Sequence, residues 1–423
     1  MSAEIMRALQ PDQQRLLQAI NDLANIVEPD TPGWTRRFPS GAYLRGREWL
    51  RTRMQNAGLS TRIDAAGNLL AERAGSADLP PILIGSHTDT VLGGGRYDGI
   101  LGVLGAIEVA QCLDEAGVTL RHPLIVADFL AEEANDYGIS CVGSRALAGN
   151  FKPEWLDRTL NGLTLADAIR AVGGTPEALG TPLASKGAVA ACLELHIEQG
   201  PVLDQRGKLL AAVNGIVGIQ RGTLVLQGQP DHAGTTPMEL RRDALATAAV
   251  IISTLEALCR DEPQAVGTVG RLEVSPNQSN VIPGTVTLTA EIRSLDAEIL
   301  EHTWQALWEA ATAAAQQRGV ALELLALTST PPALAERWLV DLVHQVCRRL
   351  DDGAIVLPSG AGHDSSQLAQ LAPTAMIFVP SIGGRSHCPE EATTPEHLVL
   401  GVAALAHAVV AVDQALDAEG HGQ

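Results

Sequence analysis

Three histidines stand at positions where a β-sheet would present side chains to a ligand. His87 and His387 each follow an apolar run of the sequence, and His196 lies within the alternating run 190–197. Neutral imidazole is a common ligand of zinc, manganese and cobalt in proteins. A lone histidine at the end of a strand more often forms only hydrogen bonds, so a metal site requires further donors nearby.

Acidic residues occupy comparable positions. Asp98 precedes Gly99 and an apolar segment that is typical of a helix, so its carboxylate either caps that helix or binds a metal. Glu132 and Glu133 follow the apolar run 124–130. Because adjacent side chains diverge, one of this pair can bind a metal while the other acts as a general base toward water. Alternatively, one is solvated and the other caps a helix.

Together these groups predict a centre for two divalent ions. Their mixture of nitrogen and oxygen donors suits zinc, manganese or cobalt, and it differs from an iron–sulfur cluster or a four-cysteine zinc site. The five candidate ligands are His87, Asp98, Glu133, His196 and His387. Glu132 is the candidate base, and Asp89 can accept the second ring N–H of His87. Glycines 93–95 would let the backbone crowd the centre.

The elements that must position these side chains alternate between strand and helix. Apolar runs predict strands at 80–84, 124–130 and 190–197, helices at 15–27, 44–57 and 99–112, and a short strand pair near 66–72. This βαβ order predicts a mostly parallel sheet that is covered on both faces. Ligand sites in such sheets lie beyond the carboxyl ends of the strands. Since a covered sheet has no wet face, Glu194, His196 and Glu198 should be buried.

The middle of the chain follows a different order, beginning at a glycine-containing hinge at 213–218. Its patterns predict strands at 219–227, 267–274, 285–293 and 320–327, with helices at 239–259 and 296–317. The order βαββαβ is that of a ferredoxin-like unit. We therefore expect an α/β protein in which residues 1–213 and 330–423 form a catalytic metal-binding domain. Residues 214–329 form an inserted ferredoxin-like α+β domain.

Composition limits the classes of function. The 30 Lys and Arg residues against 49 Asp and Glu residues give a net charge of −19, which excludes a general attraction to nucleic acid or anionic lipid. An anionic substrate would therefore need a local cation. The first fourteen residues lack a signal-peptide pattern, and the absence of a long uninterrupted apolar run favours a cytoplasmic protein with no membrane partner. Six scattered cysteines predict free thiols, most of them buried, instead of a disulfide framework.

Seven segments closely resemble the amidohydrolase branch of the di-metal aminoacylase and glutamate-carboxypeptidase superfamily. That branch contains N-carbamoyl-L-amino acid hydrolases, β-ureidopropionase and allantoate amidohydrolase. The segments run in family order from Gly85 to Glu391: GSHTDTVLGGGRYDG, AEEANDYGISCVGSRALAG, LELHIEQGP, VGIQRGTLVLQGQPDHAGTTPMELRRDA, PNQSNVIPG, SGAGHDSSQLA and VPSIGGRSHCPEE.

The resemblance implies a role for each candidate ligand. One metal ion would be held by His87 and His196, the second by Glu133 and His387, and Asp98 would bridge them. Two divalent ions per subunit are implied, either zinc or manganese, with cobalt or nickel as further possibilities.

The resemblance also implies the remaining catalytic groups. Glu132 would be the general base, and Asp89 would orient His87. The inserted domain would act as a lid and would join two chains into a homodimer, bringing His232 to the substrate to steady the developing oxyanion. Taken alone, the loop around His232 is typical of an exposed polar turn.

The expected substrate is a small ureido compound with a carboxylate, most specifically an N-carbamoyl-L-amino acid, which would yield the amino acid, CO2 and ammonia. Arg293 ends a predicted strand and can hold a carboxylate with both arms of its guanidinium, although a solvated arginine is the plain alternative. Asn280 and Gln199 would hydrogen-bond the carboxylate and the ureido group. Gly360 would supply backbone near the ureido end.

Other functions stay open at this stage. Allantoate carries a carboxylate and two ureido groups, so an allantoate amidohydrolase is the nearest alternative. An N-acyl amino acid amidase or peptidase is another, although peptidase branches usually have a carboxylate where His196 stands. Many relatives place an arginine where this chain has Asp136, within Ala134–Tyr137, so the substrate can differ from the familiar ones. A metal-binding module without catalysis would be expected to lack Glu132 or a ligand.

Overall fold

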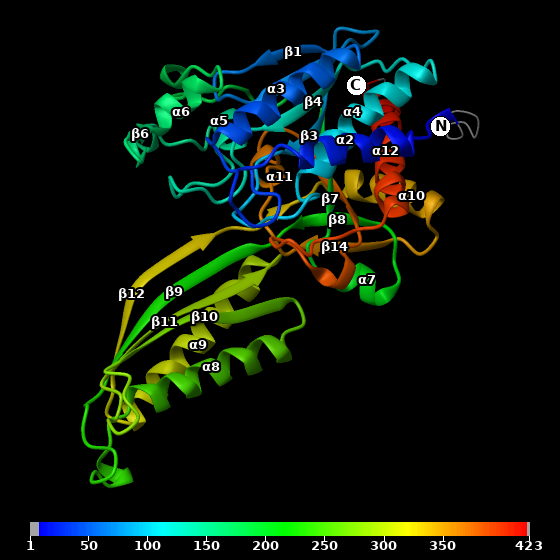
Figure 1. The fold of residues 1–423 in the computed structure, drawn as a ribbon. Helices are drawn as coiled ribbons and strands as arrows, with labels where there is room; N and C mark the ends of the chain where they lie inside the picture. The colour runs from blue at the N-terminus through cyan, green and yellow to red at the C-terminus, as the bar shows by residue number, and fades with distance from the viewer. Residues whose placement is uncertain (1–7, 421–423) are drawn as a thin grey trace. The chain divides into compact units, whose positions relative to one another are not determined.

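A computed structural model of the chain describes residues 8–420, and Figure 1 shows their fold. The described chain forms two compact units. The first contains the residues up to Gly215 and those from Ala335 onward, and the second contains Ile216–Leu334. The expectation that the first fourteen residues lack a signal peptide concerns residues 1–7 in part, and these seven lie outside the described range.

The first unit is built on a mixed sheet whose strands follow the order β1-β2-β4-β3-β7-β15-β8, with β14 also paired to β8. These strands are β1 (Ser60–Ile63), β2 (Leu69–Arg73), β3 (Ile82–His87), β4 (Leu124–Phe129), β7 (Ala191–Ile197), β8 (Ala211–Ile216), β14 (Ile355–Ser359) and β15 (Thr374–Val379). The central strands β4, β3, β7 and β15 are parallel, whereas β1, β2 and β8 are antiparallel to their neighbours. The predicted parallel sheet is confirmed for the strands that precede the candidate ligands.

The strand pair expected near 66–72 is displaced, because a turn occupies part of that range. The main-chain and side-chain amides of Asn68 donate to the Asp64 carboxylate at 2.9 and 2.8 Å. The N–H of Gly67 donates to the carbonyl of Asp64 at 3.0 Å. This Asx-type turn joins β1 to β2 and uses Asn68, a polar residue within the range predicted as a strand pair.

Helices cover both faces of the sheet. Ile82 and Ile84 pack into the main core, whereas Leu83, between them, packs into a separate cluster on the opposite face. This alternation is that of a strand buried on both sides. The helices are α2 (Gln13–Ala24), α3 (Gly41–Asn56), α4 (Ile100–Glu115), α5 (Val142–Ala148), α6 (Leu165–Ala171), α7 (Val202–Arg206), α10 (Arg337–Leu350), α11 (Ser365–Leu368) and α12 (Pro395–Gly420), and a small ribbon joins β5 (Thr159–Leu160) to β6 (Leu163–Thr164).

Helix α12 is long and apolar enough to cross a membrane, with a mean hydropathy of 1.8 over Pro395–Leu416. However, 78% of its most apolar window is buried inside the protein. It packs against α4, α10 and β15, and Val402, Leu405 and Val409 belong to the main core. Its hydropathy is therefore that of a core helix.

The second unit follows the predicted βαββαβ order. Its elements are β9 (Gly218–Gln227), α8 (Ala244–Asp261), β10 (Ala265–Ser275), β11 (Thr285–Ser294), α9 (Ala297–Gln317) and β12 (Ala321–Thr330), and β13 (Ala333–Leu334) follows. The sheet has the antiparallel order β10-β11-β9-β12. Alternate residues of β11, including Val286, Leu288 and Ile292, pack against the two helices. The unit is thus a ferredoxin-like layer of helices on a sheet.

Helix α8 begins five residues later than expected. Asp243 is its N-cap and accepts hydrogen bonds from the N–H groups of Leu245 and Ala246, both at 2.9 Å. The preceding Met238–Leu240 forms a single 3-10 turn after Pro237. The helix therefore starts where a carboxylate satisfies its first free N–H groups.

Candidate metal centre

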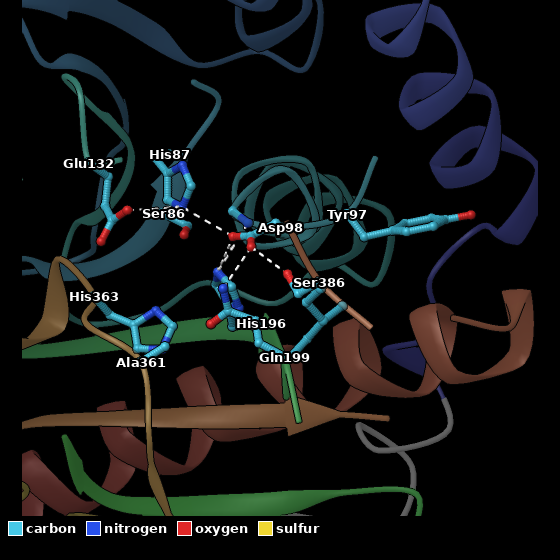
Figure 2. Close-up of polar contacts among 12 residues, drawn as sticks. Ser86, His87, Tyr97, Asp98, Glu132, His196, Gln199, Ala361, His363 and Ser386 are labelled. Atoms are coloured by element: carbon cyan, nitrogen blue, oxygen red, sulfur yellow. Dashed lines mark hydrogen bonds and ion pairs between the residues drawn. The ribbon is translucent and has the colours of Figure 1, made fainter. Parts of the chain in front are cut away.

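The five candidate ligands lie together in the first unit, beyond the carboxyl ends of its central strands. His87 ends β3, His196 is the last residue but one of β7, and His387 follows β15. Asp98 precedes α4, and Glu133 follows β4. The convergence predicted from the parallel sheet is therefore present, and Figure 2 shows Asp98 between His87 and His196.

Asp98 is the common neighbour of the three histidines. Its Oδ1 lies 3.2 Å from Nε2 of His196 and 3.6 Å from Nε2 of His87, and its Oδ2 lies 3.2 Å from Nε2 of His387. The N-cap of α4 is Gly99, which makes no side-chain capping bond, so Asp98 does not cap that helix. Its carboxylate is directed at the imidazoles.

The donors form two groups that share Asp98. His87, Asp98 and His196 make one group, and Asp98, Glu133 and His387 make the other; within each, the ligand atoms lie within 4.8 Å of one another. The Nδ1 atoms of His87 and His196 bond main-chain carbonyls at 3.0 and 2.8 Å, which leaves both Nε2 atoms toward Asp98. This donor set fits two divalent ions bridged by one carboxylate.

A third group of described residues, Glu194, His196 and His363, has ligand-atom spacing of the same kind. Its donors are already engaged: Glu194 accepts from Ser86 and Ser365, and Nε2 of His363 lies 2.9 Å from Oγ of Ser359. The Nε2 atom of His196 accepts the N–H of Gly99 at 3.0 Å and lies 3.2 Å from Asp98, so it is directed at the first group. We therefore assign this third group a supporting role rather than a metal.

Asp89 is the partner of the second ring nitrogen of His87, as expected, but through its main chain. The Nδ1 atom of His87 lies 3.0 Å from the main-chain carbonyl oxygen of Asp89. The carboxylate of Asp89 is 3.6 Å from the same nitrogen, which is beyond a hydrogen bond. The carboxylate instead accepts the N–H groups of Glu132 and Glu133 at 3.2 and 3.1 Å. Asp89 therefore ties the end of β3 to the segment that carries the two glutamates.

Glu132 is buried beside the ligand groups. Its Oε2 lies 3.6 Å from Nε2 of His87. Burial raises the pKa of Glu132 well above its usual value, and the charges of Asp364 and Glu133 add to that effect against the opposing His87. A carboxyl group with a raised pKa accepts a proton more readily, which suits a general base.

The ligand candidates themselves have shifted pKa values. Burial raises the pKa of Asp98, but hydrogen bonds from His196, His387 and His87 more than offset this and hold it well below its usual value. Burial and the charge of Asp98 raise the pKa of Glu133 to about 7. The hydrogen bond to Asp98 raises the pKa of His387 to about 9.

Two glycines make the close packing around the centre possible, and one of them, Gly95, belongs to the expected stretch 93–95. A Cβ on Gly99 would lie 2.4 Å from the His87 ring, and a Cβ on Gly95 would lie 2.1 Å from Glu391. Gly99 also has a left-handed φ of 67°. Gly99 is therefore the glycine that faces a ligand, because no side chain fits between the start of α4 and His87.

Glu391 and Ser386 are site residues that we did not predict. Glu391 is buried and accepts the N–H groups of Tyr97 and Asp98 at 2.9 and 3.2 Å. The Ser386 hydroxyl lies 2.9 Å from carboxylate oxygens of both Asp98 and Glu391. Their only signal was membership of the segment around His387, because hydrogen bonds across nearly 300 residues leave no local pattern.

His363 and Arg36 are further unpredicted groups. The ring of His363 packs edge-on against that of His196, with centroids 4.6 Å apart. Arg36 is fully buried, donates to the carbonyl of Thr88 at 2.8 Å, and accepts the N–H of Thr90 at 3.2 Å through its own carbonyl. It therefore fixes the segment that follows His87 and places a cation near the buried carboxylates.

Gln199 touches the centre directly. Its amide Nε2 donates to Oδ2 of Asp98 at 2.6 Å and lies 3.4 Å from Nε2 of His387. Gly360 follows β14 at an exposed position with open space around it. Asp136 is exposed and lies 3.7 Å from Arg37, so the acidic residue at the expected arginine position forms a surface ion pair.

The three remaining candidates belong to the second unit, and the structure brings only two of them together. His232 and Asn280 lie on exposed, adjacent segments: His232 is bridged to Val281, and the N–H of Ala233 donates to the carbonyl of Asn280 at 2.9 Å. Arg293 lies near the opposite end of the β9–β11 pair.

The register gives the scale of this separation. Thr285 pairs with Gln227 at the end near His232, whereas Arg293 pairs with Ile219. Eight residues of strand span about 26 Å. The guanidinium of Arg293 is also engaged by Glu291, at 2.7 Å from Nε, so it is neither free nor simply solvated.

Comparison with known proteins adds independent information. The profile of peptidase family M20/M25/M40 matches residues 83–411. The chain is 39% identical over 398 residues to the N-carbamoyl-L-amino acid amidohydrolase of Geobacillus stearothermophilus, covering 94% of this chain and 97% of that protein. It is 36% identical over 401 residues to the allantoate amidohydrolase of Escherichia coli K12, covering 93% and 96%. An amidase of the hydantoinase/carbamoylase family from Burkholderia multivorans has a similar crystal structure, with a TM-score of 0.90 at 33% identity, covering 96% and 98%.

The pKa values predict that metal uptake depends on pH. In the metal-free protein His387 keeps its proton up to about pH 9 and Glu133 up to about pH 7, and both must lose it to bind a metal. The affinity for Mn²⁺ should therefore rise from pH 6 to pH 9, with proton release. Titration calorimetry in two buffers of different ionisation enthalpy measures both quantities. His387→Gln should release fewer protons, and an affinity independent of pH would contradict the assignment.

Proposed function

Because the chain belongs to peptidase family M20/M25/M40 and is a hydrolase of C–N bonds other than peptide bonds, we propose that it cleaves a small ureido compound bearing a carboxylate. The most specific form of this proposal is an N-carbamoyl-L-amino acid. The observation that carries it is the pair of ligand groups sharing Asp98, with a buried Glu132 beside them. The named activities of the two relatives support the ureido group.

The first part of the proposal concerns the metals. Two divalent ions, zinc or manganese, would be held by the His87 and His196 pair and by the Glu133 and His387 pair, with Asp98 between them. When bound, such ions polarise the scissile carbonyl and make a water molecule more acidic. The family is metal-dependent, and the donor set suits these ions.

The second part concerns proton transfer by the chain itself. Glu132 would accept a proton from the attacking water and pass it to the nitrogen that leaves. The bond between the carbamoyl carbon and the α-nitrogen breaks, the amino acid departs, and the remaining carbamate decomposes to CO2 and ammonia. Asp89 supports this role by holding the N–H of Glu132, which fixes the backbone of the base.

The third part concerns the substrate carboxylate and the subunits. We assign the carboxylate to Arg293 and Asn280, the oxyanion to His232, and the ureido end to Gln199 and Gly360. A small substrate cannot span about 26 Å, so Arg293 and the His232 segment of one chain cannot both bind it. This separation supports a homodimer joined through the second unit, in which each substrate meets residues of two chains.

Glu132→Gln should lower kcat by roughly two to four decades, the usual contribution of a positioned acid–base group. Metal content should be unchanged, because Glu132 belongs to neither ligand group. The adjacent Glu133→Gln is the matched control and should lower metal content instead. Turnover by the metal-loaded enzyme and elemental analysis separate the two effects. A Glu132→Gln enzyme with near wild-type turnover would exclude this residue as the base.

The substrate proposal predicts a ranking of kcat/KM. N-carbamoyl-L-amino acids should exceed allantoate, which has a second ureido group, and N-acyl amino acids, which have none. They should also exceed N-carbamoyl-β-alanine, whose extra methylene changes the spacing between its carboxylate and its ureido group. Ammonia release distinguishes ureido cleavage from cleavage of an ordinary amide. A clear preference for allantoate would replace the proposed substrate, and a preference for N-acyl amino acids would remove the ureido group from it.

The dimer proposal predicts complementation between two inactive variants. Mixing His232→Ala chains with Glu132→Gln chains should restore activity, because each heterodimer would contain one site with both groups intact. Differently tagged chains allow heterodimers to be isolated before assay. If purified heterodimers stay inactive, His232 does not act on the partner's substrate.

A further inference from the structure

Cys141 contacts Glu132 through its side chain. All six cysteines are free thiols, and Cys141 is only 5% exposed. Its Sγ donates a hydrogen bond to Oε1 of Glu132 at 3.4 Å. The other carboxylate oxygen, Oε2, is the one that lies near His87. The two oxygens of Glu132 therefore have different partners, one a thiol and the other a ligand imidazole.

The main chain around Cys141 also holds Glu132. The N–H of Cys141 donates to the carbonyl of Glu132 at 2.8 Å. The next two N–H groups, of Val142 and Gly143, donate to the carbonyls of Ala131 and Leu130 at 3.1 and 2.9 Å. The N–H groups at the start of α5 thus bind the carbonyl groups of residues 130–132, and the last of these residues is the proposed base, Glu132.

The backbone at both ends of this contact is unusual. Cys141 has φ 53° and ψ 42°, and Ala131, directly before Glu132, has φ 51°. Residues other than glycine seldom adopt this left-handed conformation, which persists only where the surroundings hold it. The chain therefore maintains a strained arrangement that brings this thiol to this carboxylate.

Burial raises the pKa of the Cys141 thiol well above its usual value, and the neighbouring charge of Glu132 adds to the effect. The thiol accordingly keeps its proton at neutral pH and acts as the donor. A thiol that stays protonated is also a poor nucleophile, so its chemistry here is that of a hydrogen-bond donor.

We propose that Cys141 is a positioning residue for Glu132, whose carboxylate it anchors through Oε1 so that Oε2 faces the water and the leaving nitrogen. This inference rests on the proposed function, in which Glu132 is the base. It predicts an effect on the chemical step that is separate from substrate binding and from metal binding, because Cys141 belongs to neither ligand group.

The test compares Cys141→Ala, which removes the donor, with Cys141→Ser, which keeps one. With the substrate selected by the panel above, N-carbamoyl-L-alanine being the first probe, Cys141→Ala should lower kcat about tenfold, as expected for losing a hydrogen bond to a charged group. KM and bound Mn²⁺ should be unchanged. Cys141→Ser should recover kcat to within about threefold of wild type. Cys141→Gly, which suits the left-handed backbone, is the second donor-free variant if the alanine protein does not fold.

Cys112 is a matched control. Its buried thiol donates to Oε1 of Glu108 at 3.6 Å, a bond of the same kind to a carboxylate without a proposed role in chemistry. Cys112→Ala should leave kcat unchanged. A wild-type kcat in Cys141→Ala, or equal losses in the alanine and serine variants, would overturn the positioning role. An active Glu132→Gln enzyme would exclude Glu132 as the base and so contradict the proposed function itself. An inactive Glu132→Gln enzyme together with a normal Cys141→Ala enzyme would exclude only the positioning role of Cys141.

Discussion

The burial of Asp98 among three imidazoles is the interaction on which the rest of the first unit depends. A carboxylate that is 5% exposed is stable only if cations or hydrogen-bond donors surround it. The chain provides them from three places: the ends of β3 and β7 and the segment after β15. A mostly parallel sheet brings such distant segments to one edge, which explains why this architecture suits the site.

The same requirement explains the hydrogen bonds that surround the ligands. Asp89 and Glu391 each use a carboxylate to hold two consecutive N–H groups, one pair at Glu132 and Glu133 and the other at Tyr97 and Asp98. Arg36 places a buried cation near Asp89. The whole chain carries a net charge of −19, yet these buried carboxylates are balanced locally by N–H donors and a cation.

Sequence reasoning located the ligand candidates because their signal is local. His87, Glu133 and His387 each follow an apolar run, and parallel strands end at a common edge. The supporting residues have no such signal, since Glu391 acts on backbone N–H groups almost 300 positions away. Residue spacing placed Asp89 beside His87, but it does not reveal whether the carbonyl or the carboxylate meets the ring. The start of α8 was misjudged because apolar periodicity continues past the cap at Asp243.

Four of the left-handed residues of the first unit constrain how such a protein can change. Ala131, Cys141, Gln199 and His387 all have positive φ, and all lie at or beside the proposed site. Glycine would relax the backbone at each of these positions. At the last three it would also remove a side chain of the site: Cys141 contacts Glu132, Gln199 contacts Asp98, and His387 contacts Asp98 and Glu133. Conformational stability and activity are therefore opposed at these positions. Selection or engineering for thermal resistance alone would favour substitutions there that dismantle the centre, whereas the helices of the main core offer gains without this trade-off.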